Sequence, residues 1–145
     1  MDQRISLITL GSQNLTKARE FYQSLGWVEH EQSSDKVVFF QLKNGLVLGL
    51  YGWKDLAEDA GVPHDGNGFR GTALAYNVSS KEQVQPVIDA AILAGGKQVK
   101  RAQDVFWGGY SGYFSDLDGH LWEVAYNPFA TLTEDGRFSI GEAFE

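Results

Sequence analysis

Glu123 is the residue whose setting most clearly suggests chemistry. It lies in the otherwise apolar stretch HLWEVAY, residues 120–126. Because alternate side chains of a strand point to opposite faces, Leu121, Glu123 and Ala125 share one face. A carboxylate on an apolar wall needs a partner, such as an arginine, a hydroxyl or a ligand amine. Glu123 is therefore a candidate to orient a ligand or to act as a general base, and the alternative is a structural carboxylate held by a tyrosine hydroxyl or a water.

Aromatic side chains interleaved with glycines form a second candidate feature, FWGGYSGYF at residues 106–114. Glycines let the backbone bend near the mouth of a cavity, and rings offer flat, rigid contact area to a planar or cationic ligand. The expected ligand contacts, besides Glu123, are Trp107, Tyr110, Tyr113, Tyr51 and Phe40. The alternative for each ring is an ordinary place in the hydrophobic core.

Metal coordination is not expected from the residue types present. The chain contains 0 Cys, which excludes thiolate ligands, thiolate nucleophiles and disulfides. Its three histidines are His30, His64 and His120. His30 falls in an early extended segment, His64 in a loop, and His120 has the opposite strand parity to Glu123. We therefore expect surface or turn histidines, no metal and no cofactor.

The charge balance limits the classes of partner. Of the 145 residues, 12 are Lys or Arg and 19 are Asp or Glu, which gives a formal net charge of −7. An acidic surface without a basic cluster argues against nucleic acids and anionic membranes. The N-terminal MDQR lacks the features of a signal peptide, and no segment has the length of a membrane span. We expect a cytoplasmic protein whose partner is a small organic molecule.

The elements that must position these residues fall into two similar halves. In the first half, residues 1–52, we expect a strand at 4–10, a helix at 15–25 between an Asn14 cap and Gly26, extended chain at 27–31, and strands at 36–42 and 46–51 joined at Gly45. A linker, residues 53–71, follows, with a short helix at 54–60 and a stretch rich in Gly, Pro, Asp and Asn.

The second half, residues 72–128, repeats this order. We expect a strand at 72–78, a helix capped by Ser79 or Ser80 that runs to Leu93, extended chain at 97–105, and strands at 110–115 and 120–126 joined at Gly119. The recurrence indicates an internal duplication, and two such units would enclose a cavity between their sheets. The alternative is chance recurrence in an α+β chain. We expect no function in the acidic tail, residues 129–145.

Two motifs resemble those of a known family. The spacing Leu15…Phe21-Tyr22-x-x-Leu25-Gly26 and the stretch GYFSDLDGHLWEV at 112–124 are similar to the first helix and the closing hairpin of the vicinal oxygen chelate superfamily. That group includes glyoxalase I, extradiol dioxygenases, fosfomycin-resistance enzymes and bleomycin-binding proteins. The resemblance implies an α+β fold of two βαβββ modules that form a cup-shaped, eight-stranded mixed sheet, commonly in a homodimer.

The resemblance also implies where a metal would bind. Metal-dependent members carry up to four ligands on the first and last strands of the two modules, and these positions fall here at Glu123, Gly49, Ala73 and near Leu7. Of these residues, only Glu123 has a metal-binding side chain. Neither first strand contains His, Asp or Glu, so a shift of one residue restores no ligand.

The sequence thus favours one function over two others. We expect a metal-independent protein similar to the bleomycin-resistance type, which binds an aromatic or cationic compound with Glu123 as its polar anchor. The first alternative is a lyase or isomerase resembling glyoxalase I, in which Glu123 is the base, with or without a divalent metal. The second alternative is a non-catalytic assembly domain.

Overall fold

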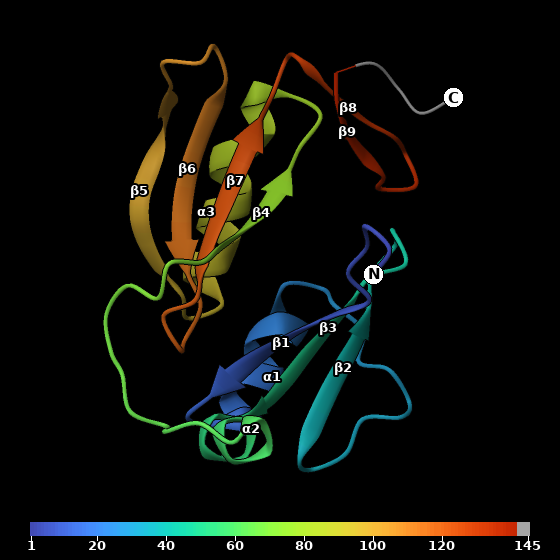
Figure 1. Ribbon diagram of the computed structural model, residues 1–145. Helices are drawn as coiled ribbons and strands as arrows, with labels where there is room; N and C mark the ends of the chain where they lie inside the picture. Colours follow the sequence, from blue (N-terminus) through green and yellow to red (C-terminus); the bar gives the residue numbers. More distant parts are fainter. Residues whose placement is uncertain (142–145) are drawn as a thin grey trace. The chain divides into compact units, whose positions relative to one another are not determined.

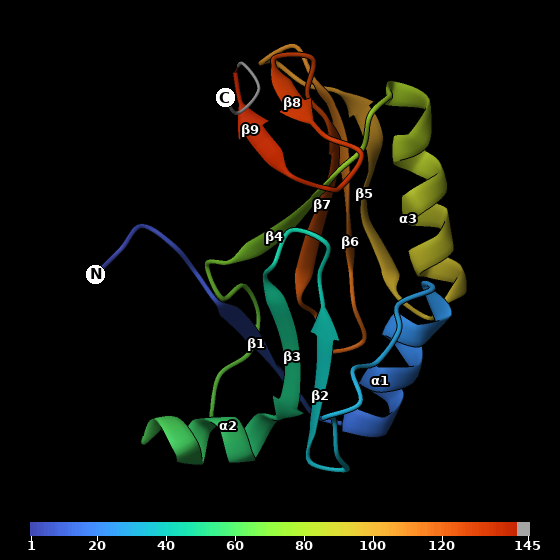
Figure 2. The same ribbon diagram turned by 90° about the vertical axis from the view of Figure 1, so that its right-hand side faces the viewer.

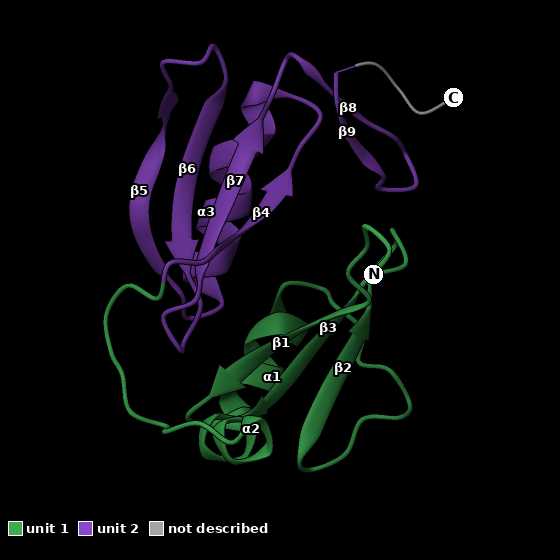
Figure 3. Ribbon diagram, in the orientation of Figure 1, with its two compact units in different colours: residues 1–70 green, residues 71–145 purple. Residues whose placement is uncertain are grey.

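The computed structural model describes residues 1–141, and the chain divides into two compact units at Arg70–Gly71 (Figures 1 and 3). Each unit combines a β-sheet with a helix that covers one of its faces (Figure 2). The α+β class that the sequence predicts is confirmed. None of the helices among residues 1–141 is long and apolar enough to cross a membrane.

The first unit holds a three-stranded mixed sheet. Its elements are β1 (Leu7–Ser12), α1 (Leu15–Ser24), β2 (Val37–Gln41), β3 (Val47–Gly52) and α2 (Trp53–Ala60). The strand order is β1-β3-β2, with β1 parallel and β2 antiparallel to β3. Helix α1 begins where predicted, because the Asn14 side chain accepts a hydrogen bond from the Lys17 amide at 3.1 Å. Its buried residues are Ala18, Phe21 and Tyr22.

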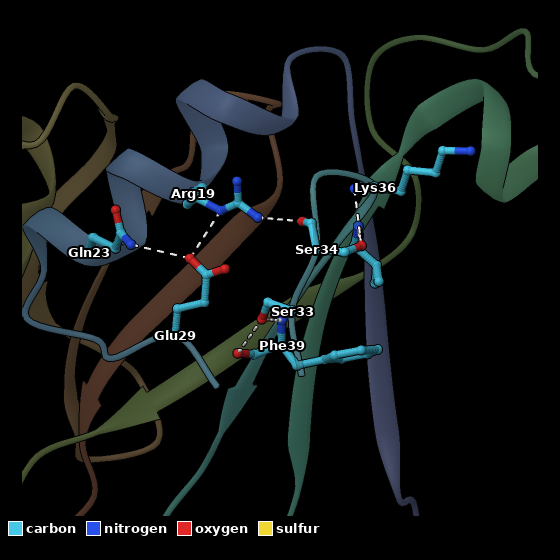
Figure 4. Close-up of polar contacts among 8 residues, drawn as sticks. Arg19, Gln23, Glu29, Ser33, Ser34, Lys36 and Phe39 are labelled. Atoms are coloured by element: carbon cyan, nitrogen blue, oxygen red, sulfur yellow. Dashed lines mark hydrogen bonds and ion pairs between the residues drawn. The ribbon is translucent and has the colours of Figure 1, made fainter. Parts of the chain in front are cut away.

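Residues 27–31 differ from the prediction of a fourth strand in this unit. They run beside β2 and donate one backbone hydrogen bond to it, from His30 N to the Phe39 carbonyl at 2.8 Å. The Ser33 hydroxyl accepts the next bond, from Phe39 N at 2.9 Å, in place of a backbone carbonyl. Glu29 is tied to α1 by an ion pair with Arg19 Nε at 3.0 Å (Figure 4). Side-chain bonds therefore hold this segment where a strand ladder was expected.

Residues 53–71, predicted as a linker, are partly fixed to the first unit. Helix α2 starts at Trp53, one residue before its predicted start. The indole Nε1 of Trp53 donates to the His64 carbonyl at 2.7 Å, and the Arg70 guanidinium lies 4.7 Å from the Trp53 ring centroid. These two contacts hold both ends of the segment 64–70 against the Trp53 indole.

The second unit holds a four-stranded sheet. Its elements are β4 (Ala73–Asn77), the 3-10 helix η1 (Lys81–Gln83), α3 (Val84–Leu93), β5 (Lys97–Asp104), β6 (Tyr110–Ser115) and β7 (Leu121–Tyr126). The strand order is β4-β7-β6-β5, with β4 parallel to β7 and the other neighbours antiparallel. Ser80 forms the predicted cap through a capping box with Gln83. Helix α3 covers one face of the sheet (Figures 1 and 2).

The turn between β6 and β7 fixes the register of that hairpin. The buried Asp116 carboxylate accepts hydrogen bonds from the amides of Asp118 at 3.0 Å and His120 at 2.9 Å. Gly119 adopts a φ of 79°, which is a conformation that favours glycine, and Gly45 has a φ of 87° in the corresponding turn of the first unit. The matching turns agree with the predicted duplication.

The C-terminal tail is more regular than its sequence suggests. It contains a short antiparallel hairpin of β8 (Ala130–Leu132) and β9 (Phe138–Ile140). Residues 142–145 of the predicted tail lie outside the described residues.

Candidate functional site

The face of the second sheet opposite α3 carries Glu123. On β7, Trp122 and Val124 are 7% and 0% exposed and form part of the core, whereas Glu123 is half-buried on the other face. This arrangement follows the predicted alternation. In the register, Glu123 lies between Tyr113 on β6 and Ala75 on β4. The hairpin therefore brings together two of the predicted ligand contacts, Tyr113 and Glu123.

Tyr113 and Glu123 form a direct hydrogen bond. The Tyr113 hydroxyl donates to Glu123 Oε2 at 2.7 Å, and both side chains are half-buried. Within residues 71–141, Tyr113 is the only residue that forms a hydrogen bond or an ion pair with the Glu123 side chain. A carboxylate has about four acceptor positions, so this bond orients Glu123 and leaves it able to accept donors from a ligand.

Small side chains flank Glu123 on this face. Ala75 lies opposite Glu123, and Ala125 follows two residues along β7. Ser111, which is opposite Ala125, is 3% exposed. No bulky ring from these positions covers the carboxylate. On the other side of Tyr113, the register pairs it with Lys100 of β5. The neighbours of Glu123 itself are thus small, and Lys100 is the charged residue one strand further away.

The hydrogen bond changes the acidity of Tyr113. Donation to Glu123 is the main cause that raises the pKa of Tyr113 to about 12, with burial and the negative charge of Glu123 as lesser causes. The phenol therefore stays protonated beyond pH 10, where an ordinary tyrosine loses its proton. It acts as a fixed donor that holds the carboxylate in one orientation.

A pH prediction follows for stability. A tyrosine of ordinary pKa near 10 loses its proton earlier in the unfolded chain than Tyr113 does in the fold, so the fold gains stability from the neutral phenol. This contribution is complete below pH 10 and is lost as the pH rises through about 12. Because the site is partly solvated, we expect the bond to add about 1 kcal/mol to the free energy of unfolding, which is less than the full pKa shift implies.

Urea denaturation at about pH 8 and about pH 11 tests this expectation in the wild type and in Tyr113→Phe. The variant should lose less stability than the wild type between the two pH values. Tyr76→Phe, at an exposed tyrosine of β4, is the matched control and should behave as the wild type does. Equal pH dependence in the wild type and Tyr113→Phe would contradict the stated role of the bond.

The second unit holds two further aromatic candidates, Tyr110 and Trp107. Tyr110 has the opposite strand parity to Tyr113 and is paired with Tyr126, and the Lys81 ammonium lies 4.7 Å from its ring centroid. Trp107 lies in the loop between β5 and β6, where its ring fills the space that a side chain at Gly109 would occupy.

The two candidates of the first unit are Phe40 and Tyr51. Phe40 is 1% exposed and packs on the α1 side of the sheet, with ring centroids 5.8 Å from Tyr22 and 5.5 Å from Trp27. Phe40 is therefore a core residue, contrary to its predicted role as a ligand contact. Tyr51 is half-buried on β3, two residues beyond Gly49 and on the same face.

The donor set does not fit a metal ion. Gly49 has no side chain, and its neighbours on β1 are Leu7 and Thr9. On β4, Ala73 and Ala75 offer no donor beside Glu123. Across residues 1–141, no three His, Asp or Glu side chains lie together in a group that could hold a metal. A carboxylate alone binds a divalent cation weakly, so we assign no metal-dependent step to this site.

Comparisons with known proteins agree with this architecture. A family model described as Glyoxalase/Bleomycin resistance protein/Dioxygenase superfamily matches residues 4–124. A crystal structure of a glyoxalase-related enzyme from Fulvimarina pelagi is 33% identical, covers 97% of this chain and 99% of its own, and has a TM-score of 0.88. The fosfomycin resistance protein FosX from Listeria monocytogenes is 26% identical, with coverages of 88% and 95% and a TM-score of 0.67.

Lactoylglutathione lyase from Agrobacterium tumefaciens shares the fold at 21% identity, with coverages of 88% and 96% and a TM-score of 0.65. No curated protein sequence matches the chain.

Proposed function

Since this chain belongs to the glyoxalase/bleomycin resistance protein/dioxygenase superfamily, as its motifs suggested, we propose that it is a metal-independent protein that binds a small aromatic or cationic compound. The observation that supports this proposal is the bond from Tyr113 to Glu123, whose neighbour on β4 is the small Ala75. The oriented carboxylate is the polar anchor. Its negative charge favours a ligand with an amine or another cationic group, because such a group both donates hydrogen bonds and neutralises the acid.

Binding of matched probes tests the anchor. Suitable probes for isothermal titration calorimetry are bleomycin and benzylamine, which are cationic, and benzyl alcohol, which is neutral. Glu123→Gln keeps the shape of the side chain and removes its charge. We expect it to weaken the cationic probes about tenfold, the usual effect of losing a partly desolvated charge pair, and to leave benzyl alcohol within about twofold.

The control is Glu58→Gln, the same change at an exposed position of α2, which should bind all probes as the wild type does. Binding should also survive removal of metals with a chelator. Equal affinity of Glu123→Gln and the wild type for the cationic probes would refute the anchor, and loss of binding with the chelator would refute metal independence.

An enzymatic role is the second candidate, because the relative at 33% identity is described as a glyoxalase-related enzyme. In that case Glu123 is the group placed to accept a proton from a substrate, with Tyr113 fixing its orientation. Elemental analysis of the purified protein separates the two. One tightly bound Ni, Zn, Fe or Mn per chain, together with chelator-sensitive turnover, would support the enzyme and overturn the binding protein.

A further inference from the structure

A concave site lies at the end of β4, and Glu123 does not line it. It is a pocket of about 300 Å³ between the C-terminal ends of β4 and β7 and the β8–β9 hairpin. This volume is at the lower end of the range of small-molecule pockets, about 300–1,000 Å³. Glu123 and Tyr113 are not among the residues that line it. The tail for which the sequence predicted no function thus forms one wall of a pocket.

The polar lining of this pocket is neutral, and most of it is already engaged. Ser79 donates its hydroxyl hydrogen to Gln83 Oε1 at 3.1 Å, and Thr131 donates to the Gly141 carbonyl at 3.1 Å. The Asn127 side-chain oxygen accepts from the Phe129 amide at 2.9 Å. The lining contains no Asp, Glu, Lys, Arg or His. A charged ligand would find no counter-charge here, so the pocket selects against ions.

Asn77 also lines the pocket and is half-buried. Its carboxamide forms no hydrogen bond within residues 1–141. The carboxamide has one acceptor oxygen and two donor hydrogens. Because Asn77 is half-buried and not fully buried, water can satisfy this group, and a ligand with the reciprocal donor and acceptor can take the place of that water.

Flat apolar surfaces accompany Asn77. Tyr126 and Phe138, from β7 and β9, both line the pocket, and Phe138 is 40% exposed. Aromatic side chains favour planar molecules through contact with their rings. The pocket thus offers the Asn77 carboxamide for a paired hydrogen bond and two aromatic residues for a planar body.

We infer that this pocket binds a small, neutral, planar molecule that carries an N–H and a C=O side by side, as in a lactam or a carboxamide. Asn77 forms the two reciprocal hydrogen bonds, and the ring of the molecule packs against Tyr126 and Phe138. The site is separate from the Glu123 anchor in both position and chemistry, because the anchor favours cations and this pocket favours neutral amides.

Two probes that differ only at the donor test this inference by ¹⁵N–¹H NMR titration. The probe 2-pyridone has a ring N–H beside its carbonyl, and 1-methyl-2-pyridone has the same ring without the donor. We expect saturable shifts at residues 77–79 and 130–132 with 2-pyridone, and about fivefold weaker binding of the methylated ring. Asn77→Ala should remove this preference, so that both probes bind equally weakly.

Asn44→Ala, at an exposed turn in the first unit, is the control and should keep the full preference. Dispersed spectra of Asn77→Ala would show that the variant is folded; if it fails to fold, Asn77→Leu replaces it. The inference is overturned if about 20 mM 2-pyridone causes no saturable shift at the pocket, or if folded Asn77→Ala still discriminates between the probes.

Discussion

Gly112→Ala is expected to lower the free energy of unfolding by about 3 kcal/mol, because the added methyl group has no space. A Cβ at this position would lie 2.6 Å from Ile88 Cδ1, 2.7 Å from the Lys100 carbonyl oxygen and 2.8 Å from the Ala102 nitrogen. Two of these three atoms belong to the backbone of β5, at the register shift between Lys100 and Gln103. Gly112 thus allows the sheet and α3 to approach, directly beside Tyr113.

Chemical denaturation followed by tryptophan fluorescence measures this effect. Gly49→Ala is the matched control, since Gly49 is also inside a strand, and its Cβ would meet its nearest neighbours at ordinary distances of 3.5–3.6 Å. We expect Gly49→Ala to change stability by less than about 1 kcal/mol.

Adding Ile88→Val to Gly112→Ala removes the clash with Ile88 Cδ1 and keeps the two backbone clashes. Less than half of the lost stability should therefore return. If Gly112→Ala is as stable as the wild type, then α3 does not pack as closely on β6 as described here.

Asp116→Ala is expected to cost about 2 kcal/mol, because two backbone amides of the β6–β7 turn lose their acceptor. Asp116 is 5% exposed, and its carboxylate holds the amides of Asp118 and His120. Asp116→Asn retains an acceptor oxygen of the same shape and should lose less than half as much. Denaturation midpoints of the two variants, measured at neutral pH, give the comparison.

The same turn positions the candidate site. By setting the register of the hairpin, it places Tyr113 opposite Glu123. If Asp116→Ala proved as stable as Asp116→Asn, the side chain would have no structural role in that register.

The sequence predicts the parts of the fold that depend on local chemistry. Asn14 caps α1 through a bond to a residue three positions away, and Gly119 closes a turn that needs a positive φ. The alternation around Glu123 likewise predicts its face correctly. The pairing of Tyr113 with Glu123 can also be predicted from the sequence, because a hairpin that turns at 116–119 sets these two residues opposite one another.

The parts that the sequence does not predict depend on distant contacts. Residues 27–31 look extended, but Arg19 and Phe39 determine how they are held. Phe40 looks like a ligand contact, but the register of β2 on β3 places Phe39 on the face of Gly49 and Phe40 in the core. The pocket around Asn77 depends on the β8–β9 hairpin, whose two strands of three residues each are too short to show an alternating pattern.

The contacts of Trp53 have a consequence for engineering. The stretch Gly61–Gly68 has the glycine, proline and polar residues of a loop in which foreign sequence or new chain ends are usually tolerated. Here, the indole of Trp53 binds the carbonyl of His64 and lies under Arg70. Insertion or circular permutation within residues 64–70 would disturb these contacts. The loop-like composition of this stretch is therefore a poor guide for choosing an insertion site or new chain ends.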